Sequence, residues 1–197
     1  THIGNFLDVT RGGPQTFLLN NLLRFPQAMS PAAAYGSAIH ATLQHTHAHL
    51  SATGKHRAVE DILSDFETNL AAHRLSDQDE AMLLQKGVDT LQTFLSEKYD
   101  SFTESQKVEL NFASQHSIVD KAHLTGSLDL VDIDPAIKAM TVTDYKTGKP
   151  SRSWSGKTDY EKIKLHKYRQ QLMFYKLLVE HSRDYSGYTV ENGVLQF

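Results

Sequence analysis

The stretch Met140–Pro150, with the sequence MTVTDYKTGKP, is the part of the chain around which both the fold and the chemistry are organised. In an extended strand, successive side chains alternate between the two faces of the sheet. Asp144 and Lys146 therefore project to one side of the predicted strand, whereas Tyr145 projects to the other. A glycine and a proline follow and end the strand. The pattern thus presents an acid and an amine together at the point where a loop begins.

A second acid, Asp129, stands in the string Gly126-Ser-Leu-Asp129, within another short apolar run. Two carboxylates and a lysine at the ends of neighbouring strands predict a site for a hard divalent cation beside a phosphate. Asp129 and Asp144 are suitable oxygen ligands, and the backbone carbonyl of Tyr145 is a third candidate. The alternative interpretation of Asp144 and Lys146 is an ordinary exposed ion pair at the end of a strand.

The length and composition favour a single domain over residues 1–197, mainly helical over 1–100 and built on a sheet over 101–197. Cysteine is absent, which excludes disulfides, thiolate zinc sites and an iron–sulfur cluster held by this segment. No apolar stretch is long enough to cross a bilayer, so we expect no membrane association and a cytoplasmic location. The opening Thr-His-Ile-Gly has no initiator methionine, so we expect a piece excised from a longer protein.

The distribution of charge says more than the formal net charge of −3. Nine of the 20 Lys and Arg residues lie between positions 138 and 169, against three acids in the same block. A local positive field of this kind suits a polyanionic substrate. The alternative interpretation of the block is a solvated basic helix.

Periodicity predicts five helices, over residues 15–25, 31 to about 53, 58–74, 77–99 and 160–182. It also predicts strands over residues 107–117, 124–133, 139–146 and 188–197. The first three strands are separated by short turns, which favours an antiparallel meander. The helical N-terminal block carries no evident chemistry apart from His40, whose imidazole could complete a carboxylate site and would favour Mn²⁺ somewhat.

The last predicted helix adds Gln171 and Tyr175, which lie one turn apart and therefore on one face. Lys164 and either Lys167 or Tyr168 continue that stripe earlier in the helix, so the face suits contacts to phosphate and sugar. The alternative is a helix whose tyrosine packs in the core and whose glutamine lies on the surface.

Four short motifs follow one another in the order Gly36-x-x-x-His40, Gly126-x-x-Asp129, Asp144-Tyr-Lys146-Thr-Gly148 and Gln171-x-x-x-Tyr175. This series resembles that of the RecB-type nucleases of the PD-(D/E)xK superfamily, to which lambda exonuclease and the restriction endonucleases also belong. The resemblance spans residues 36–175, and each motif falls on the expected helix or strand. Residues 6–25 also resemble the entry helices of nuclease domains fused to UvrD/Rep-type helicases.

The resemblance implies an α/β (α+β) fold with a restriction-endonuclease-like core, in which helices flank a central mixed sheet. It implies that His40, Asp129, Asp144 and the Tyr145 carbonyl bind Mg²⁺ or Mn²⁺, that Lys146 is the catalytic lysine, and that Gln171 and Tyr175 support substrate binding. It further implies a DNA exonuclease or single-strand and end-processing enzyme of repair or recombination, working with a helicase motor in the same or a partner chain. We expect DNA contacts from Lys149, Arg152, Trp154, Lys157, Lys164 and Lys167.

Two other functions remain open at this level. One is a DNA-binding module of the same fold that no longer cuts. The other is a metal-buffering domain that uses His45, His47 and His49, although a solvated helix face explains these residues better. Glu109 is interpreted as an exposed strand residue rather than as an outer member of the acidic site.

Overall fold

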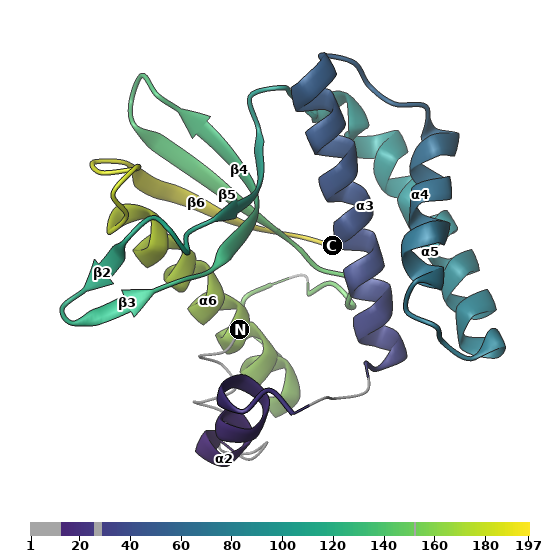
Figure 1. Cartoon of the computed structure of the whole chain (residues 1–197), viewed down its shortest axis with the longest axis horizontal. Helices are drawn as coiled ribbons and strands as arrows, with labels where there is room; N and C mark the ends of the chain where they lie inside the picture. The colour runs from purple at the N-terminus through teal and green to yellow at the C-terminus, as the bar shows by residue number, and fades with distance from the viewer. Residues whose placement is uncertain (1–12, 26–28, 152) are drawn as a thin grey trace. The chain divides into compact units, whose positions relative to one another are not determined.

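The computed structural model describes residues 13–25, 29–151 and 153–197 of the chain, which is drawn in Figure 1. The chain divides into two compact units. The smaller unit comprises the described part of Thr1–Ser30 together with Ser151–Gln171, and the larger unit comprises Pro31–Pro150 together with Leu172–Phe197.

The smaller unit contains a short helical segment and the first half of a long helix. Its segment consists of helix α2, Gly13–Phe17, which continues as a π-helical turn, η2, over Leu18–Leu22. The observed helical segment therefore begins two residues earlier and ends three residues earlier than the helix predicted over 15–25. Residues 6–12 of the resemblance to the entry helices lie outside the described residues. The long helix, α6, spans Asp159–Glu180, and its last nine residues belong to the larger unit.

Three helices form the helical part of the larger unit, and their predicted positions are confirmed to within a few residues. They are α3 over Pro31–Thr53, α4 over Val59–Ala71 and α5 over Asp77–Lys98. Helix α3 ends where Gly54 adopts a positive φ of 68°, a conformation that glycine reaches without steric cost. Helix α5 begins after Ser76, whose hydroxyl accepts a hydrogen bond from a backbone amide of the first turn.

The larger unit also contains a mixed sheet of four strands in the order β1-β4-β5-β6. The strands are β1 over Lys107–Asn111, β4 over Ser127–Asp134, β5 over Ala139–Tyr145 and β6 over Thr189–Gln196. The first three are antiparallel, as the short turns predict, and β6 runs parallel to β5. This mixed sheet with its flanking helices confirms the predicted fold class. No described helix is long and apolar enough to cross a membrane.

The run predicted as a single strand over 107–117 is divided. Strand β1 ends at Asn111, whose side chain accepts a hydrogen bond from the amide of Ala113 and so starts a turn. A separate hairpin follows, in which β2, Ser117–Val119, pairs with β3, Ala122–Leu124. The prediction missed this hairpin because strands of three residues leave almost no alternating pattern.

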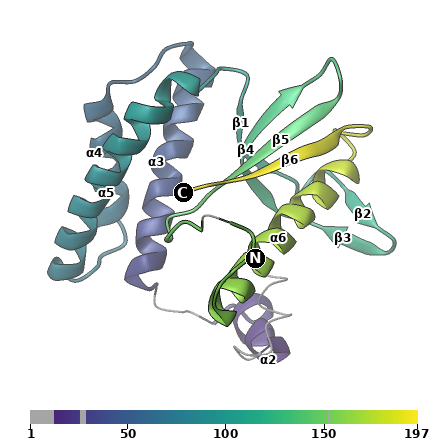
Figure 2. The same ribbon diagram turned by 180° about the vertical axis from the view of Figure 1, so that it is seen from behind.

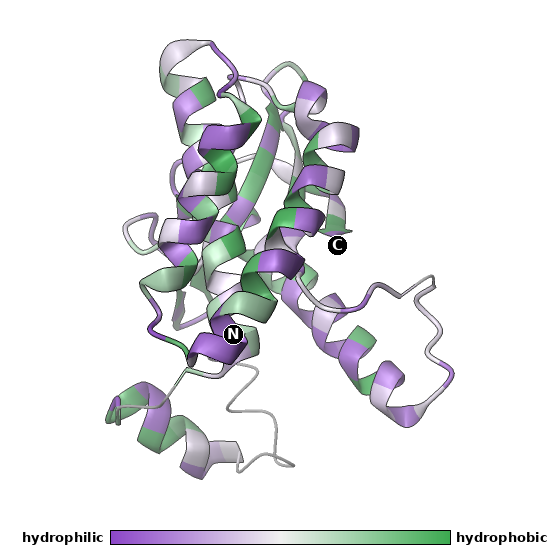
Figure 3. Cartoon of the chain, turned by 90° about the vertical axis from the view of Figure 1, so that its right-hand side faces the viewer, coloured by the Kyte–Doolittle hydropathy of each residue, from purple (hydrophilic) through white to green (hydrophobic). Residues whose placement is uncertain are grey.

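The buried side chains of the larger unit form two core clusters. The first joins α3, α4 and α5 to the sheet through Leu130 and Tyr145. The second joins the last turns of α6 to the sheet through Leu178 and Val179, which pack against Val142. Seen from both sides in Figures 1 and 2, α3 lies between the sheet and the pair α4 and α5. Figure 3 shows hydrophobic and hydrophilic positions banded along these helices, as amphipathic helices require.

Candidate active site

The two acids quoted from neighbouring strands lie side by side. The register between β4 and β5 pairs Leu130 with Thr143, and Asp129 and Asp144 are the next residues along the two strands. The backbone amide of Tyr145 donates a hydrogen bond of 2.9 Å to Asp129 Oδ2. The Asp129 side chain is 13% exposed and that of Asp144 only 2%. Both carboxylates are therefore shielded from water, and they lie near enough for the charge of Asp144 to raise the pKa of Asp129.

His40 approaches the same point from α3. Its Nε2 lies 3.0 Å from the carbonyl oxygen of Tyr145, and its Nδ1 lies 3.4 Å from Asp129 Oδ2. The neighbouring Ile39 is buried in the first core cluster, which fixes this part of α3 against the sheet. The structure thus brings together an imidazole nitrogen, a carboxylate and a backbone carbonyl from three different elements.

Glu109, at the centre of β1, is a member of this group and not the exposed strand residue that the sequence suggested. It is half-buried, and the ligand atoms of His40, Glu109 and Asp129 all lie within 4.8 Å of one another. Imidazole nitrogen and carboxylate oxygens suit Mn²⁺ and Mg²⁺. The donor set therefore fits a hard or borderline divalent cation.

The backbone of Glu109 is strained. Its φ is +46°, a conformation that a residue with a Cβ rarely adopts and that costs energy. On either side of it, Val108 packs with the first core cluster and Leu110 with the second. Regular alternation would place these two residues on one face. The sheet therefore departs from regular alternation at Glu109, which is where its carboxylate joins the site.

Asp144 has different partners from Asp129. Its Oδ2 lies 2.5 Å from Lys146 Nζ, and its Oδ1 accepts a hydrogen bond of 2.7 Å from the hydroxyl of Tyr175. Tyr175 is also buried in the second core cluster. This residue therefore packs in the core and contacts a residue of the candidate site at the same time. Gln171 precedes it by four residues on α6 and belongs to the smaller unit.

The electrostatics of the site centre on Asp129. Burial raises the pKa of its carboxyl to about 6, and the charges of Asp144 and Glu109 act in the same direction. The nearby His40 and the amide of Tyr145 lower the pKa but do not offset these effects. A carboxylate crowded by two others in a partly buried place is stabilised by a cation, which makes the cluster receptive to a metal ion.

The side chain of Tyr145 is fixed on the helical side of the sheet. His47 Nε2 lies 3.0 Å from the Tyr145 hydroxyl, and the His47 ring stacks on Phe102 with centroids 3.8 Å apart. Burial lowers the pKa of His47 to about 4, so the imidazole is neutral near pH 7. The interpretation of His47 as part of a solvated helix face is therefore wrong. The sequence did contain an indication that His47 is buried, because this residue stands four positions after Leu43 in the apolar stripe of α3.

Tyr145→Phe tests whether this buried hydrogen bond supports the strand. We expect the free energy of unfolding to fall by about 1–2 kcal/mol, because the variant leaves a buried imidazole nitrogen without its partner. Urea denaturation at pH 7 measures the change, and Tyr160→Phe is the matched control because Tyr160 is 72% exposed. Equal stability of the two variants would show that the bond contributes nothing.

The predicted DNA-contacting residues fall in both units. Lys149 belongs to the larger unit and follows β5 directly, whereas Trp154, Lys157, Lys164 and Lys167 belong to the smaller unit. Within the smaller unit, the Arg169 guanidinium lies 5.4 Å from the centroid of the exposed Trp154 ring, and Lys164 Nζ lies 5.5 Å from that of Tyr168. Arg152 lies outside the described residues.

The histidine cluster of α3 does not form a second metal site in the described part of the chain. His45 is exposed and its Nδ1 lies 3.2 Å from Asp65 Oδ2, a carboxylate that also pairs with Arg57. His49 is exposed as well. The only group of three metal-ligating side chains among the described residues is His40, Glu109 and Asp129.

A family profile matches the chain, although no individual curated protein and no solved structure does. A profile of the PD-(D/E)XK nuclease superfamily, whose members are metal-dependent nucleases, matches residues 9–196. Because the match covers nearly the whole sequence, the chain belongs to the PD-(D/E)XK nuclease superfamily.

Proposed function

We propose that the chain is a metal-dependent deoxyribonuclease that hydrolyses phosphodiester bonds at the site between α3 and the sheet. The observation that carries the proposal is the convergence of His40, Asp129 and the Tyr145 carbonyl beside the Asp144–Lys146 pair. Membership of the nuclease superfamily supports the reaction class. The choice of DNA as substrate rests on the resemblance to the RecB-type nucleases.

A divalent cation is proposed to be held by His40, Asp129, Asp144 and the Tyr145 carbonyl, with Glu109 as an additional carboxylate. Mg²⁺ is the proposed physiological ion, and the imidazole makes Mn²⁺ an effective substitute. Such an ion stabilises charge on the scissile phosphate and lowers the pKa of an attacking water.

The protein groups around the ion have separate proposed roles. Lys146 supplies a positive charge that stabilises the phosphate and orients the attacking water. Tyr175 holds the Asp144 carboxylate in place through its hydroxyl, because that hydroxyl donates to Oδ1 at 2.7 Å. Gln171 is proposed to contact the substrate from the same helix.

The proposed substrate is a single strand or a DNA end, processed by exonucleolytic cutting during repair or recombination. The described segment 153–171 carries five Lys and Arg residues against two acids, which suits a phosphate backbone. The resemblance of residues 6–25 to entry helices of helicase-fused nucleases supports a helicase motor as the partner.

Cleavage of matched linear and circular single-stranded DNA tests the proposal. We expect loss of the linear substrate with Mg²⁺ or Mn²⁺, no loss with a chelator, and slow or no cutting of the circle. If both forms were cut at the same rate, the enzyme would be an endonuclease and the exonuclease proposal would be wrong. No cutting of either form with any divalent metal would instead support the alternative function, a DNA-binding module that no longer cuts.

Replacing Lys164 and Lys167 together by Ala tests the DNA-binding role of the smaller unit. Each backbone phosphate contact contributes about 0.7 to the slope of log affinity against log salt for a single strand. We therefore expect the slope to fall by about 1.4, with weaker binding at low salt. Fluorescence anisotropy over a salt series measures this, and Lys98→Ala with Lys121→Ala is the control of equal charge. An unchanged slope would exclude both lysines from the backbone contact.

A further inference from the structure

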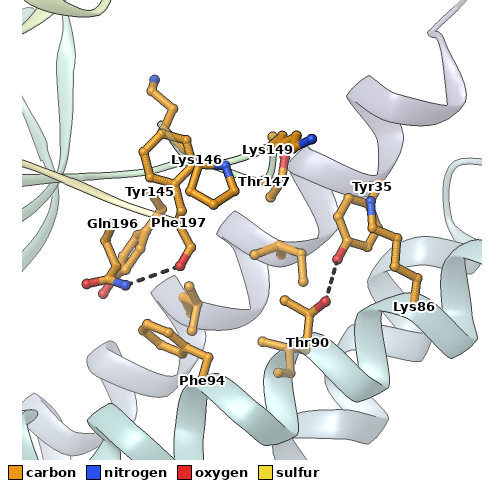
Figure 4. Close-up of a pocket in the computed structure, with 15 residues that line it drawn as sticks. Tyr35, Lys86, Thr90, Phe94, Tyr145, Lys146, Thr147, Lys149, Gln196 and Phe197 are labelled. Atoms are coloured by element: carbon orange, nitrogen blue, oxygen red, sulfur yellow. Dashed lines mark hydrogen bonds between the residues drawn. The ribbon is translucent and has the colours of Figure 1, made fainter. Parts of the chain in front are cut away.

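A hollow of about 430 Å³ adjoins the candidate site within the larger unit. Helices α3 and α5 form part of its wall, and the end of β5 with the loop that follows forms another part. Figure 4 shows Tyr35 and Lys86 on one side of it and Gln196 and Phe197 on the other. Apart from Tyr145, Lys146 and Lys149 on its wall, no residue with a role assigned above lines this space, which is in the size range of small-molecule sites.

The inner surface of the hollow is apolar and aromatic. Ile39, Leu43 and Leu91 are buried core residues that line it, and the rings of Tyr35 and Phe94 lie among them. The Tyr35 hydroxyl donates to Thr90 Oγ1 at 3.3 Å, which orients the ring. Flat aromatic and apolar surfaces bind nucleobases through their π-faces, whatever the base.

The charged side chains that line the hollow are all lysines, one of which, Lys146, is paired with Asp144. The lining includes Lys86, Lys146 and Lys149, and no acidic residue lines it in the described part of the chain. Lys86 Nζ lies 4.5 Å from the centroid of the Tyr35 ring, so a cation stands directly at the aromatic surface. An apolar interior with lysines suits a ligand that combines a flat ring with a negative group, which is the chemistry of a nucleotide.

The hollow shares two residues with the candidate site. Tyr145 and Lys146 contribute to its wall, and the Lys146 amide is fixed to β6 by a hydrogen bond of 2.7 Å to the Gln196 carbonyl. The metal-ligating carbonyl and the catalytic lysine are thus continuous with the surface that would hold a base. A strand whose phosphate lies at Lys146 has a neighbouring nucleotide within reach of this space.

We propose that the hollow binds one unstacked nucleotide of the DNA strand, its base facing inward, next to the phosphate at Lys146. This proposal rests on the nuclease function proposed above and specifies its substrate. A base held by a complementary strand cannot enter such a hollow without breaking its pair. The enzyme therefore prefers single strands and frayed ends to intact duplex at the cutting position.

The first test measures binding and needs no catalysis. A labelled single strand is compared with strands that carry one abasic residue, moved through each position in turn, by anisotropy with Ca²⁺ in place of the catalytic metal. We expect one position at which loss of the base weakens binding by about tenfold, as for other stacked bases. Equal affinities at every position would overturn the proposal.

Thr90→Trp locates the effect in the hollow. Thr90 is an exposed residue of α5 that lines it, so a large side chain there fills the space without entering the core. We expect this variant to bind the intact strand about tenfold more weakly and to lose the abasic effect. Gln92→Trp is the matched control, because Gln92 is exposed on the same helix and lines no part of the hollow.

Lys86→Gln provides a second variant that keeps the packing of α5 and removes one charge. We expect it to weaken binding of the intact strand while keeping the position of the abasic effect. If Thr90→Trp and Gln92→Trp bind alike, the hollow is not the base site and the proposal fails. A free deoxynucleoside monophosphate that binds the wild type, while strands show no abasic effect, would make the hollow a site for free nucleotides instead.

The outcome is distinguishable from that of the nuclease proposal. A position-dependent abasic effect without any cleavage would support the nucleotide site and contradict the proposed nuclease activity. Metal-dependent cleavage that is indifferent to the missing base at every position would leave the enzyme standing and refute the nucleotide site.

Discussion

Asp144→Asn and Lys146→Ala are each expected to lower the rate of metal-dependent DNA cleavage by about a thousandfold, the loss typical of removing one group that stabilises transition-state charge. The two side chains form one ion pair, with the partly buried Lys146 Nζ 2.5 Å from the buried Asp144 Oδ2. Neutralising Asp144 removes a proposed metal ligand, and truncating Lys146 removes the positive charge beside the phosphate. Single-turnover cleavage of a labelled single strand with Mg²⁺ measures both rates.

The Asn variant keeps the packing around the pair. It preserves an oxygen that accepts the Tyr175 hydrogen bond, so loss of activity cannot be attributed to collapse of the second core cluster. Lys121→Ala, in the exposed turn of the β2–β3 hairpin, is the control for removing a lysine. Both active-site variants should still bind single-stranded DNA. Wild-type cleavage rates in both would exclude the assigned site.

The effect on Asp144→Asn and Lys146→Ala together should not be the product of the single effects. Because the two residues contact each other, removing either one already disables the pair, and energies of residues that act as a unit are strongly non-additive. We expect the double variant to be about as slow as the slower single variant. A further thousandfold loss would show that the two side chains act independently.

The central strand of the site could be predicted because its signal is local. Alternation along Met140–Pro150 is enough to separate Asp144 from Tyr145, and the structure places Asp144 against Tyr175 and the Tyr145 ring in the other core cluster. Apolar periodicity located the long helices within a few residues for the same reason. Short apolar runs with turns between them likewise indicated the antiparallel meander.

The rest of the site depends on interactions that no local pattern records. The Glu109 carboxylate reaches the site because the backbone of this residue has a positive φ. The sequence of β1 does not predict this conformation, because glutamate has no preference for it. The hollow beside Lys146 needs α3, α5 and the end of β6 to meet, and these segments are far apart in the chain. Motif order predicted which side chains form the site, whereas the fold determines which groups those side chains contact.

Asp129→Asn is expected to stabilise the metal-free protein at pH 7 while abolishing its response to metal. The folded state holds the proton of Asp129 more tightly than an unfolded chain, with a pKa of about 6 against 3.8. The stability that this group contributes is therefore fully present below pH 3.8 and is lost as the pH rises to 6. At pH 7 the buried charge costs about 3 kcal/mol, which the neutral Asn avoids.

The difference in unfolding free energy between Asp129→Asn and the wild type isolates this effect. His47 contributes in the opposite direction, because its pKa falls from 6.5 to about 4 and its stabilisation is lost as the pH falls through that range. Since His47 is present in both proteins, its contribution cancels in the difference. We expect a gap of about 0.5 kcal/mol at pH 4 that grows to about 3 kcal/mol at pH 7, measured by urea denaturation with a chelator.

Adding metal should nearly close this gap in stability. An ion that binds only the folded wild type at a hundred times its dissociation constant stabilises it by about 2.7 kcal/mol, and the ion must displace the Asp129 proton to bind. The wild-type midpoint should therefore rise with Mn²⁺, more at pH 7 than at pH 5, whereas Asp129→Asn should not respond. Asp120→Asn, an exposed carboxylate in the hairpin turn, should respond like the wild type. If Asp129→Asn responded to Mn²⁺ as strongly as the wild type, the metal would bind at another site and Asp129 would not be a ligand.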